Sequence, residues 1–114
     1  MQHDDLVYVG HMLDVGRKAS AKVRGLSRAS FDADENVRLA VAHLIQTMGE
    51  AGRRVSPAYR AANPGIPWSK IIGMRNKVVH DYLNVDFDIV WGVATVELPP
   101  LLAALETLMP PDRR

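Results

Sequence analysis

The sequence predicts an all-α fold, an up-and-down bundle of four main helices plus a short connecting helix. Helix-forming residues dominate, and apolar residues recur at three- and four-residue steps along most of the chain. Runs of β-branched residues, which favour strands, are short, as at Val78-Val79. With 114 residues and a hydrophobic fraction of 47%, the chain is expected to form one domain that spans residues 1–114.

The first helix is expected to begin at Asp4 or Asp5 and to bury one apolar stripe. The stripe consists of Leu6, Val9, Leu13, Gly16, Ala19, Val23 and Leu26. Residues 27–31, which follow the stripe, are expected to form a turn.

The second main helix is expected to begin after a cap at Asp32 or Asp34. Glu35 then lies in its first turn, where a negative charge is favourable, and Gly52 is expected to end it. Its predicted buried face consists of Val37, Val41, Leu44, Met48 and Ala51.

The stretch from residue 52 to residue 67 is expected to be irregular apart from one short connecting helix. Ser56-Pro57 can begin one or two helical turns, and Asn63-Pro64-Gly65 ends them. The next main helix is expected to begin near Pro67, because proline is tolerated in a first turn.

This third main helix is expected to end after His80 or Tyr82. Its apolar positions are Ile71, Met74 (or Arg75), Val78 and Val79. Asp86 or Asp88 then caps the last helix.

Pro99-Pro100 tests the assignment of the last helix, since an interior proline costs about 3 kcal/mol. One apolar stripe nevertheless keeps its phase across the two prolines. It consists of Val90, Ala94, Leu98, Leu101, Leu105 and Leu108. Two separate helices have no reason to share a phase, so we predict a single helix kinked at Pro99-Pro100.

Composition excludes several classes of protein. The chain has no cysteine, which rules out disulfides and thiolate chemistry. No uninterrupted apolar run approaches the ~20 residues that cross a bilayer, and the polar residues 1–5 do not resemble a secretion signal. We therefore expect a cytoplasmic protein without a membrane partner. His3, His11 and His43 are too scattered to form a metal-ligand pattern, and no cofactor is expected.

Charge is unevenly distributed, although the net charge is only +1. Residues 53–80 contain six basic side chains and no acidic one, whereas residues 81–114 contain six acidic side chains. A basic middle can mark a site for an anionic ligand. The same distribution is equally consistent with chance clustering on a solvated face.

The segment from Arg75 to Tyr82 is the strongest candidate for chemistry. If it is helical, Asn76 and His80 share a face at a spacing of four, and Arg75 and Tyr82 stack at a spacing of seven. A guanidinium, an amide, an imidazole and a phenol would then form one patch. Lys77 adds a second cation to the same turn.

These side chains suit RNA cleavage without a metal. Histidine titrates near neutral pH, so His80 can take a proton from a ribose 2′-hydroxyl, which then attacks its own phosphate. Arg75 can hold the phosphate and stabilise the charge of the transition state. One histidine per chain is a weakness, because cleavage uses both an acid and a base, and a dimer would supply the second.

Each of these side chains also has a purely structural explanation. Arg75 could pair with a carboxylate of the acidic C-terminal part, and His80 could cap a helix C-terminus. Tyr82 could pack at the rim of the core. Trp68 and Trp91 are interpreted as packing residues.

The spacing Arg75, four residues, His80, one residue, Tyr82 matches the Arg-x4–6-His-x-Tyr motif, and the chain resembles the HepT-like group of HEPN domains over nearly its whole length. Further blocks before and after this motif match the family in the same order along the chain. They are Phe31, Gly49-Glu50-Ala51, Pro67-Trp68, Gly73-Met74-Arg75-Asn76, Val90-Trp91 and Leu98-Pro99.

The resemblance implies a HEPN-like bundle that forms a homodimer with its two motifs facing each other. It implies the toxin of a toxin–antitoxin system, acting as a metal-independent endoribonuclease on RNA. Arg75 and His80 would be catalytic, and Asn76, Lys77 and Tyr82 would support or bind the substrate. Glu50 would be a buried partner of Arg75 or another basic group.

In such systems the antitoxin is an MntA-like minimal nucleotidyltransferase, which would transfer adenylate from ATP to Tyr82. A bulky anionic group on Tyr82 would block the patch and repel RNA phosphate. Two alternatives stay open: a non-catalytic, nucleotide-binding partner of such a nucleotidyltransferase, and a plain dimerisation bundle.

Overall fold

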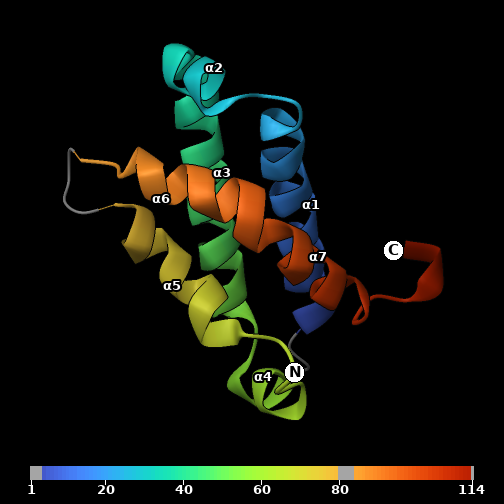
Figure 1. Ribbon diagram of the computed structural model, residues 1–114. Helices are drawn as coiled ribbons and strands as arrows, with labels where there is room; N and C mark the ends of the chain where they lie inside the picture. The colour runs from blue at the N-terminus through green and yellow to red at the C-terminus, as the bar shows by residue number, and fades with distance from the viewer. Residues whose placement is uncertain (1–3, 80–83, 114) are drawn as a thin grey trace.

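The structure is a computed structural model that describes residues 4–79 and 84–113 (Figure 1). Within this part of the chain, helices account for nearly all regular structure, and the sole strand-like feature is an isolated bridge between Val79 and Val85. The all-α prediction is therefore confirmed. The helices are α1 (Asp5–Val23), α2 (Arg28–Ala33), α3 (Glu35–Arg54), α4 (Pro57–Ala62), α5 (Trp68–Val78), α6 (Phe87–Gly92), the π-helix η1 (Val93–Glu97), α7 (Leu98–Glu106) and the 3-10 helix η2 (Pro111–Arg113).

The two longest helices, α1 and α3, form an antiparallel pair (Figure 1). The predicted stripe of α1 is largely correct, with Val9, Leu13, Gly16, Ala19 and Val23 all buried. Leu26 lies beyond the helix, because α1 ends at Val23 and Gly25 adopts a φ of +78° that favours glycine.

Residues 27–31 do not form the predicted turn, since most of them belong to the short helix α2. The Ser27 hydroxyl caps this helix by accepting a hydrogen bond from the Ser30 N–H at 3.1 Å. Phe31 is fully buried against the Trp91 ring, with a centroid distance of 5.0 Å. The serine cap and the burial of one aromatic ring explain why these residues are helical.

Helix α3 begins at the predicted cap, where Asp34 accepts a hydrogen bond from the Val37 N–H at 3.1 Å. It does not stop at Gly52 but continues to Arg54. Gly52 has a packing role instead, because a Cβ there would lie 3.3 Å from Cγ2 of Ile71 on α5.

The predicted connector is confirmed as α4. Ser56 caps it, accepting a hydrogen bond from the Tyr59 N–H at 3.1 Å, and Pro57 occupies its first turn. The Asp5 carboxylate accepts hydrogen bonds from the Ser56 N–H at 2.7 Å and from its hydroxyl at 2.9 Å. These bonds tie the start of α1 to the start of α4.

The last helix is continuous from Phe87 to Glu106, so a single helix does pass through Pro99-Pro100. Its irregular part is the π-helical turn η1, directly before the prolines, where the Leu98 N–H bonds to the Val93 carbonyl. Proline removes an N–H and crowds the carbonyl four residues earlier. The wider turn fits this missing bond, and π-turns are one established cause of helix distortion.

By length and composition this helix could also cross a membrane, contrary to what the lack of an uninterrupted apolar run suggested. An 18-residue window of the helix has a mean hydropathy of 1.4, and 39% of this window is buried inside the molecule. The core helix of a globular domain passes the same test. Here the apolar side of the helix packs on α1 and α3, through Val90, Val93, Leu98, Leu101 and Leu105 among others.

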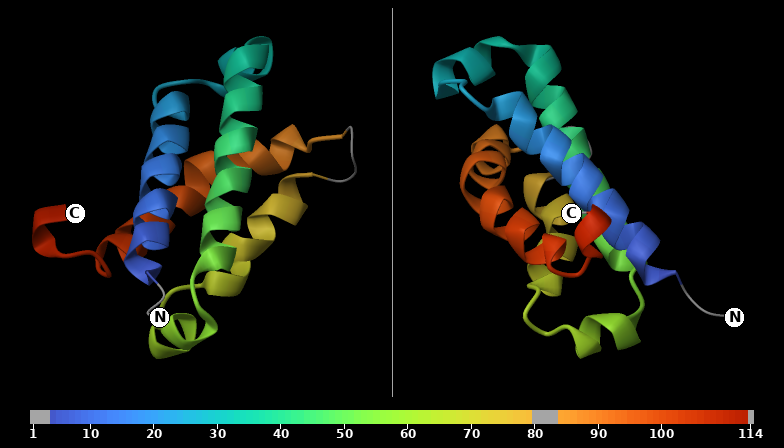
Figure 2. Two further views of the ribbon diagram at one scale, coloured as in Figure 1. Left: turned by 180° about the vertical axis from the view of Figure 1, so that it is seen from behind. Right: turned by 90° about the vertical axis from the view of Figure 1, so that its right-hand side faces the viewer.

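The bundle has two layers (Figure 2). Helices α1 and α3 form one layer, and α5 with the α6–α7 helix lies across one face of it. Helix α3 is central, because it packs against α1 on one side and α5 on the other. Arg75, the first of the predicted site residues, lies near the C-terminal end of α5, where this helix contacts α3.

Candidate functional site

Helix α5 ends at Val78, earlier than the predicted end at His80 or Tyr82. Val79 is extended (φ −115°, ψ 111°) and pairs with Val85 in the isolated antiparallel bridge. The Asp86 N–H donates to the Val78 carbonyl at 2.8 Å. Val79 and Val85 are both β-branched, and such residues favour the extended backbone that this bridge requires.

The predicted helical spacing is therefore confirmed only as far as Val78. His80 and Tyr82, the proposed base and the proposed modification site, lie outside the described residues. The described residues on either side hold the two ends of their segment together, through the bridge of Val79 with Val85. Arg75, Asn76 and Lys77 lie on the last turns of α5 as predicted.

Arg75 is held by an ion pair with α3. Its Nε lies 3.1 Å from Oε1 of Glu50, and the other oxygen of Glu50 lies 3.3 Å from Nη2 of Arg53. The Arg75 side chain remains 56% exposed and that of Glu50 33% exposed. The expected pairing of Glu50 with Arg75 is thus confirmed, although Glu50 is half-buried rather than buried.

Close contact between two helices creates this ion pair. At Gly49, a Cβ would lie 3.1 Å from the Ile71 carbonyl oxygen and 3.3 Å from the Arg75 backbone nitrogen. Contacts this short with backbone atoms leave little room for a side chain, so α5 lies directly on the α3 backbone here. The neighbouring residue Glu50 is consequently within reach of the Arg75 guanidinium.

A pocket of about 140 Å³ adjoins Arg75, and it is lined by Gln46, Arg75, Asn76 and Val79. It lies between α3 and the end of α5, and its wall includes Val79, the last described residue before His80 in the sequence. Gln46 was not predicted as a site residue from the sequence. Its position four residues before Glu50 was the available signal, since this spacing puts both side chains on one helix face.

Lys77 does not line this pocket. Its Nζ lies 3.6 Å from Glu97 on η1, and Lys70 Nζ lies 3.1 Å from the same carboxylate. The basic middle and the acidic end of the chain thus neutralise each other in part, across the contact of α5 with η1. A role of Lys77 in RNA binding stays a prediction.

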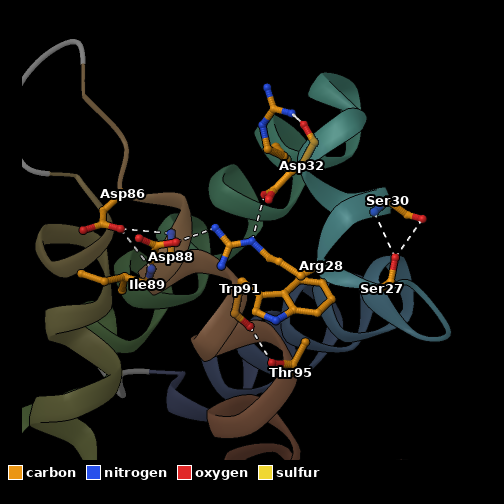
Figure 3. Close-up of polar contacts among 10 residues, drawn as sticks. Ser27, Arg28, Ser30, Asp32, Asp86, Asp88, Ile89, Trp91 and Thr95 are labelled. Carbon is orange, nitrogen blue, oxygen red and sulfur yellow. Dashed lines mark hydrogen bonds and ion pairs between the residues drawn. The ribbon is translucent and has the colours of Figure 1, made fainter.

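A second polar network fastens the start of α6 to α2 (Figure 3). The Arg28 guanidinium donates hydrogen bonds to the Asp32 carboxylate at 2.9 Å and to the Asp88 carboxylate at 2.5 Å. Both bonds raise the pKa of Arg28, and the bond to Asp32 has the larger effect. Asp86 caps α6 by accepting from the N–H groups of Asp88 and Ile89. The start of α6 is thereby both capped and tied to α2.

The two tryptophans pack in the core, away from the pocket beside Arg75. Trp68 is buried and its indole N–H donates to the Asn63 carbonyl at 2.9 Å, while Trp91 packs on Phe31. Both tryptophans are packing residues, as interpreted. In residues 4–79 and 84–113, no three histidine or acidic side chains gather in a way that could hold a metal ion.

Comparison with known proteins identifies relatives along most of the chain. The family model "Ribonuclease HepT-like" matches residues 12–108. The "Putative RNase TTE0752" of Caldanaerobacter subterraneus is 26% identical over 93% of this chain and 95% of its own length. The "Probable ribonuclease HepT" of Thermococcus cleftensis is 30% identical over 68% of this chain and 71% of its own length. No solved structure matches the chain significantly.

Proposed function

The chain belongs to the HepT-like family of ribonucleases, and on that premise we propose that it is the toxin of a toxin–antitoxin pair and cleaves RNA without a metal ion. The observation that carries the proposal is the state of Arg75. This guanidinium is anchored at Nε by Glu50, is more than half exposed, and borders a pocket whose lining includes Val79, the residue before His80 in the sequence.

In the proposed reaction, the imidazole of His80 takes the proton of a ribose 2′-hydroxyl. The 2′-oxygen bonds to the neighbouring phosphorus, the bond from phosphorus to the 5′-oxygen breaks, and a protonated imidazole returns a proton to that oxygen. Arg75 holds the phosphate and stabilises the added negative charge. Asn76 at the pocket wall contributes hydrogen bonds to the RNA.

We further propose that the active form is a homodimer in the cytoplasm. Each chain has one motif histidine, whereas general acid and general base catalysis in the same step use two. A second copy that brings its motif to the same cleft would supply the other. The RNA would then bind across both copies, and no membrane would take part.

The proposed partner is a minimal nucleotidyltransferase that acts as the antitoxin. It would transfer AMP from ATP to the phenolic oxygen of Tyr82 and release pyrophosphate. The phosphodiester adds a negative charge two residues from His80, where it would repel RNA phosphate. Mass spectrometry after incubation with this partner and ATP tests the step, and an unmodified Tyr82 in a neutralised toxin would contradict it.

An RNA cleavage assay with EDTA present tests the enzymatic proposal. We expect the native chain to cleave, and His80→Ala and Arg75→Ala to lose at least about 100-fold in rate, the low end of what one acid–base group or one transition-state hydrogen-bond donor contributes. Equal cleavage by all three proteins would contradict the assigned roles. No cleavage by the folded native dimer would instead favour a non-catalytic binding partner of the nucleotidyltransferase.

A further inference from the structure

We propose that Gln46 and Asn76 form a subsite that recognises a nucleobase next to the cleaved phosphate of the RNA. This inference rests on the proposed ribonuclease function and adds to it a determinant of substrate specificity. Its basis is the composition of the pocket beside Arg75, in which two of the four lining side chains are carboxamides.

Gln46 lies on the motif side of Arg75. It precedes Glu50 by four residues on α3, so the two side chains share the face that meets α5. Helices α3 and α5 run in opposite directions (Figure 1), and one turn back from Glu50 is therefore one turn forward from Arg75. That turn ends at Val79, directly before the segment that carries His80.

The four lining groups have complementary chemistry for one nucleotide. The Arg75 guanidinium suits the phosphate. A carboxamide offers a hydrogen-bond donor and an acceptor side by side, the arrangement that reads the edge of a base. The half-buried Val79 offers an apolar wall to a base face. Single-stranded RNA presents its bases in the way that such a subsite requires.

The fold makes little use of the Gln46 amide. Among the described residues, its side chain has no recorded hydrogen-bond partner, and it is half-buried at the pocket wall. Hydrogen bonds made in a partly desolvated pocket discriminate between bases better than those on an open surface. The amide therefore has both the position and the free bonding capacity that base recognition needs.

The experiment compares base preference in native and variant proteins. Short RNAs with one cleavage site carry each of the four bases in turn on either side of that site, and kcat/KM is measured. We expect the native chain to prefer its best base over its worst by at least about 10-fold. Gln46→Met keeps the length and helix propensity but removes the amide, and should reduce this ratio to within about twofold.

Two further variants make the result specific. His43→Met puts the same residue on the exposed surface of α3, outside the pocket, and should keep the native preference. Asn76→Leu changes an exposed position of α5 and should weaken the preference at the same nucleotide even if Gln46→Met fails to fold. The proposal would be overturned if the native chain had the same kcat/KM for all four bases. It would also be overturned if both pocket variants kept the native base preference.

Binding separates this proposal from the catalytic one. The same RNAs with 2′-O-methyl groups cannot be cleaved, and their affinity is measured by fluorescence anisotropy. Base preference in binding that disappears in Gln46→Met, with no cleavage of the unmodified RNAs, would retain the base subsite and refute the ribonuclease proposal. Cleavage with a base preference that does not depend on Gln46 would instead retain the ribonuclease proposal and refute the base subsite.

Discussion

Arg75 shows how a single contact can orient a side chain without burying it. Its Nε is paired with Glu50, and more than half of the side chain remains exposed. An exposed ion pair stabilises a fold by only about 0–1 kcal/mol. The main effect of this pair is consequently geometric: it limits the rotamers of a cation that must meet a phosphate.

Glu50→Gln tests this geometric role. The variant removes a negative charge beside the phosphate site, so RNA should bind at least as well and KM should not rise. The less restrained Arg75 should stabilise the transition state less well, and kcat should fall by about 10-fold, the result of losing one interaction worth about 1.4 kcal/mol. Steady-state kinetics on a single-site RNA measures both constants.

Arg53→Gln is the matched control for this variant. It also removes a partner of Glu50, but it leaves the contact between Glu50 and Arg75 in place. We expect its kcat to stay within about twofold of the native value. A kcat loss in Arg53→Gln as large as that in Glu50→Gln would show that the shared carboxylate does not act through Arg75.

Tyr59 makes the free energy of unfolding depend on pH in the alkaline range. Burial, and then the nearby Asp5 charge, raise its pKa above 10.0. A raised folded-state pKa means that this contribution to stability is fully present below pH 10 and is lost as pH rises through the folded-state value. The free energy of unfolding of the native chain should therefore fall more steeply above pH 10 than that of Tyr59→Phe, as measured in urea. Parallel curves for the two proteins would contradict the assignment.

At the level of elements, the contact of α3 with α5 determines the site. Gly49 lets the two backbones approach, and this approach puts Glu50 and Gln46 beside the last turn of α5. The early end of α5 at Val78 matters equally. Val79, the next residue, is extended and pairs with Val85 in an antiparallel bridge.

Gly49→Ala should separate the two helices. Its Cβ would meet three backbone atoms at 3.1 to 3.3 Å, and overpacking of this kind costs about 1–3 kcal/mol. RNA cleavage should fall as well, because Arg75 moves away from Glu50. Chemical denaturation and the RNA cleavage assay measure the two effects.

Gly73→Ala is the control at the element level. This glycine lies in the interior of α5, and a Cβ there would meet nothing within 4 Å. Alanine favours helix over glycine by about 0.8–1.0 kcal/mol, so this variant should be more stable than the native chain. Similar destabilisation by both substitutions would show that the helix contact is not as close as described.

At the level of the whole molecule, two layers share one apolar core. The layer of α1 and α3 is covered on one face by α5 and by the α6–α7 helix (Figure 2). Gly16 on α1 illustrates how closely the layers fit, since a Cβ there would lie 2.7 Å from Cδ2 of Leu102 on α7 and 3.3 Å from the sulfur of Met48 on α3. The site lies at the edge of this core, where helix ends leave polar groups accessible.

Much of the fold could be predicted because it depends on local sequence patterns. The stripes on α1, α3 and the last helix, the caps Asp34, Ser56 and Asp86, and the passage of one helix through Pro99-Pro100 all follow from periodicity and capping chemistry. The site was predicted only in part. Arg75 and its partner Glu50 are confirmed neighbours, whereas Gln46 and the early end of α5 were missed.

By itself, the sequence determined the helical class, the order of the helices and the family motif, since each of these depends on residues close together in the chain. Only the tertiary structure decided where α5 ends and what faces Arg75. Val79 leaves the helix because Val85 pairs with it, and Gln46 reaches the pocket because Gly49 admits α5. Neither contact follows the three- and four-residue spacing within one helix, so local helical periodicity contains no information about them.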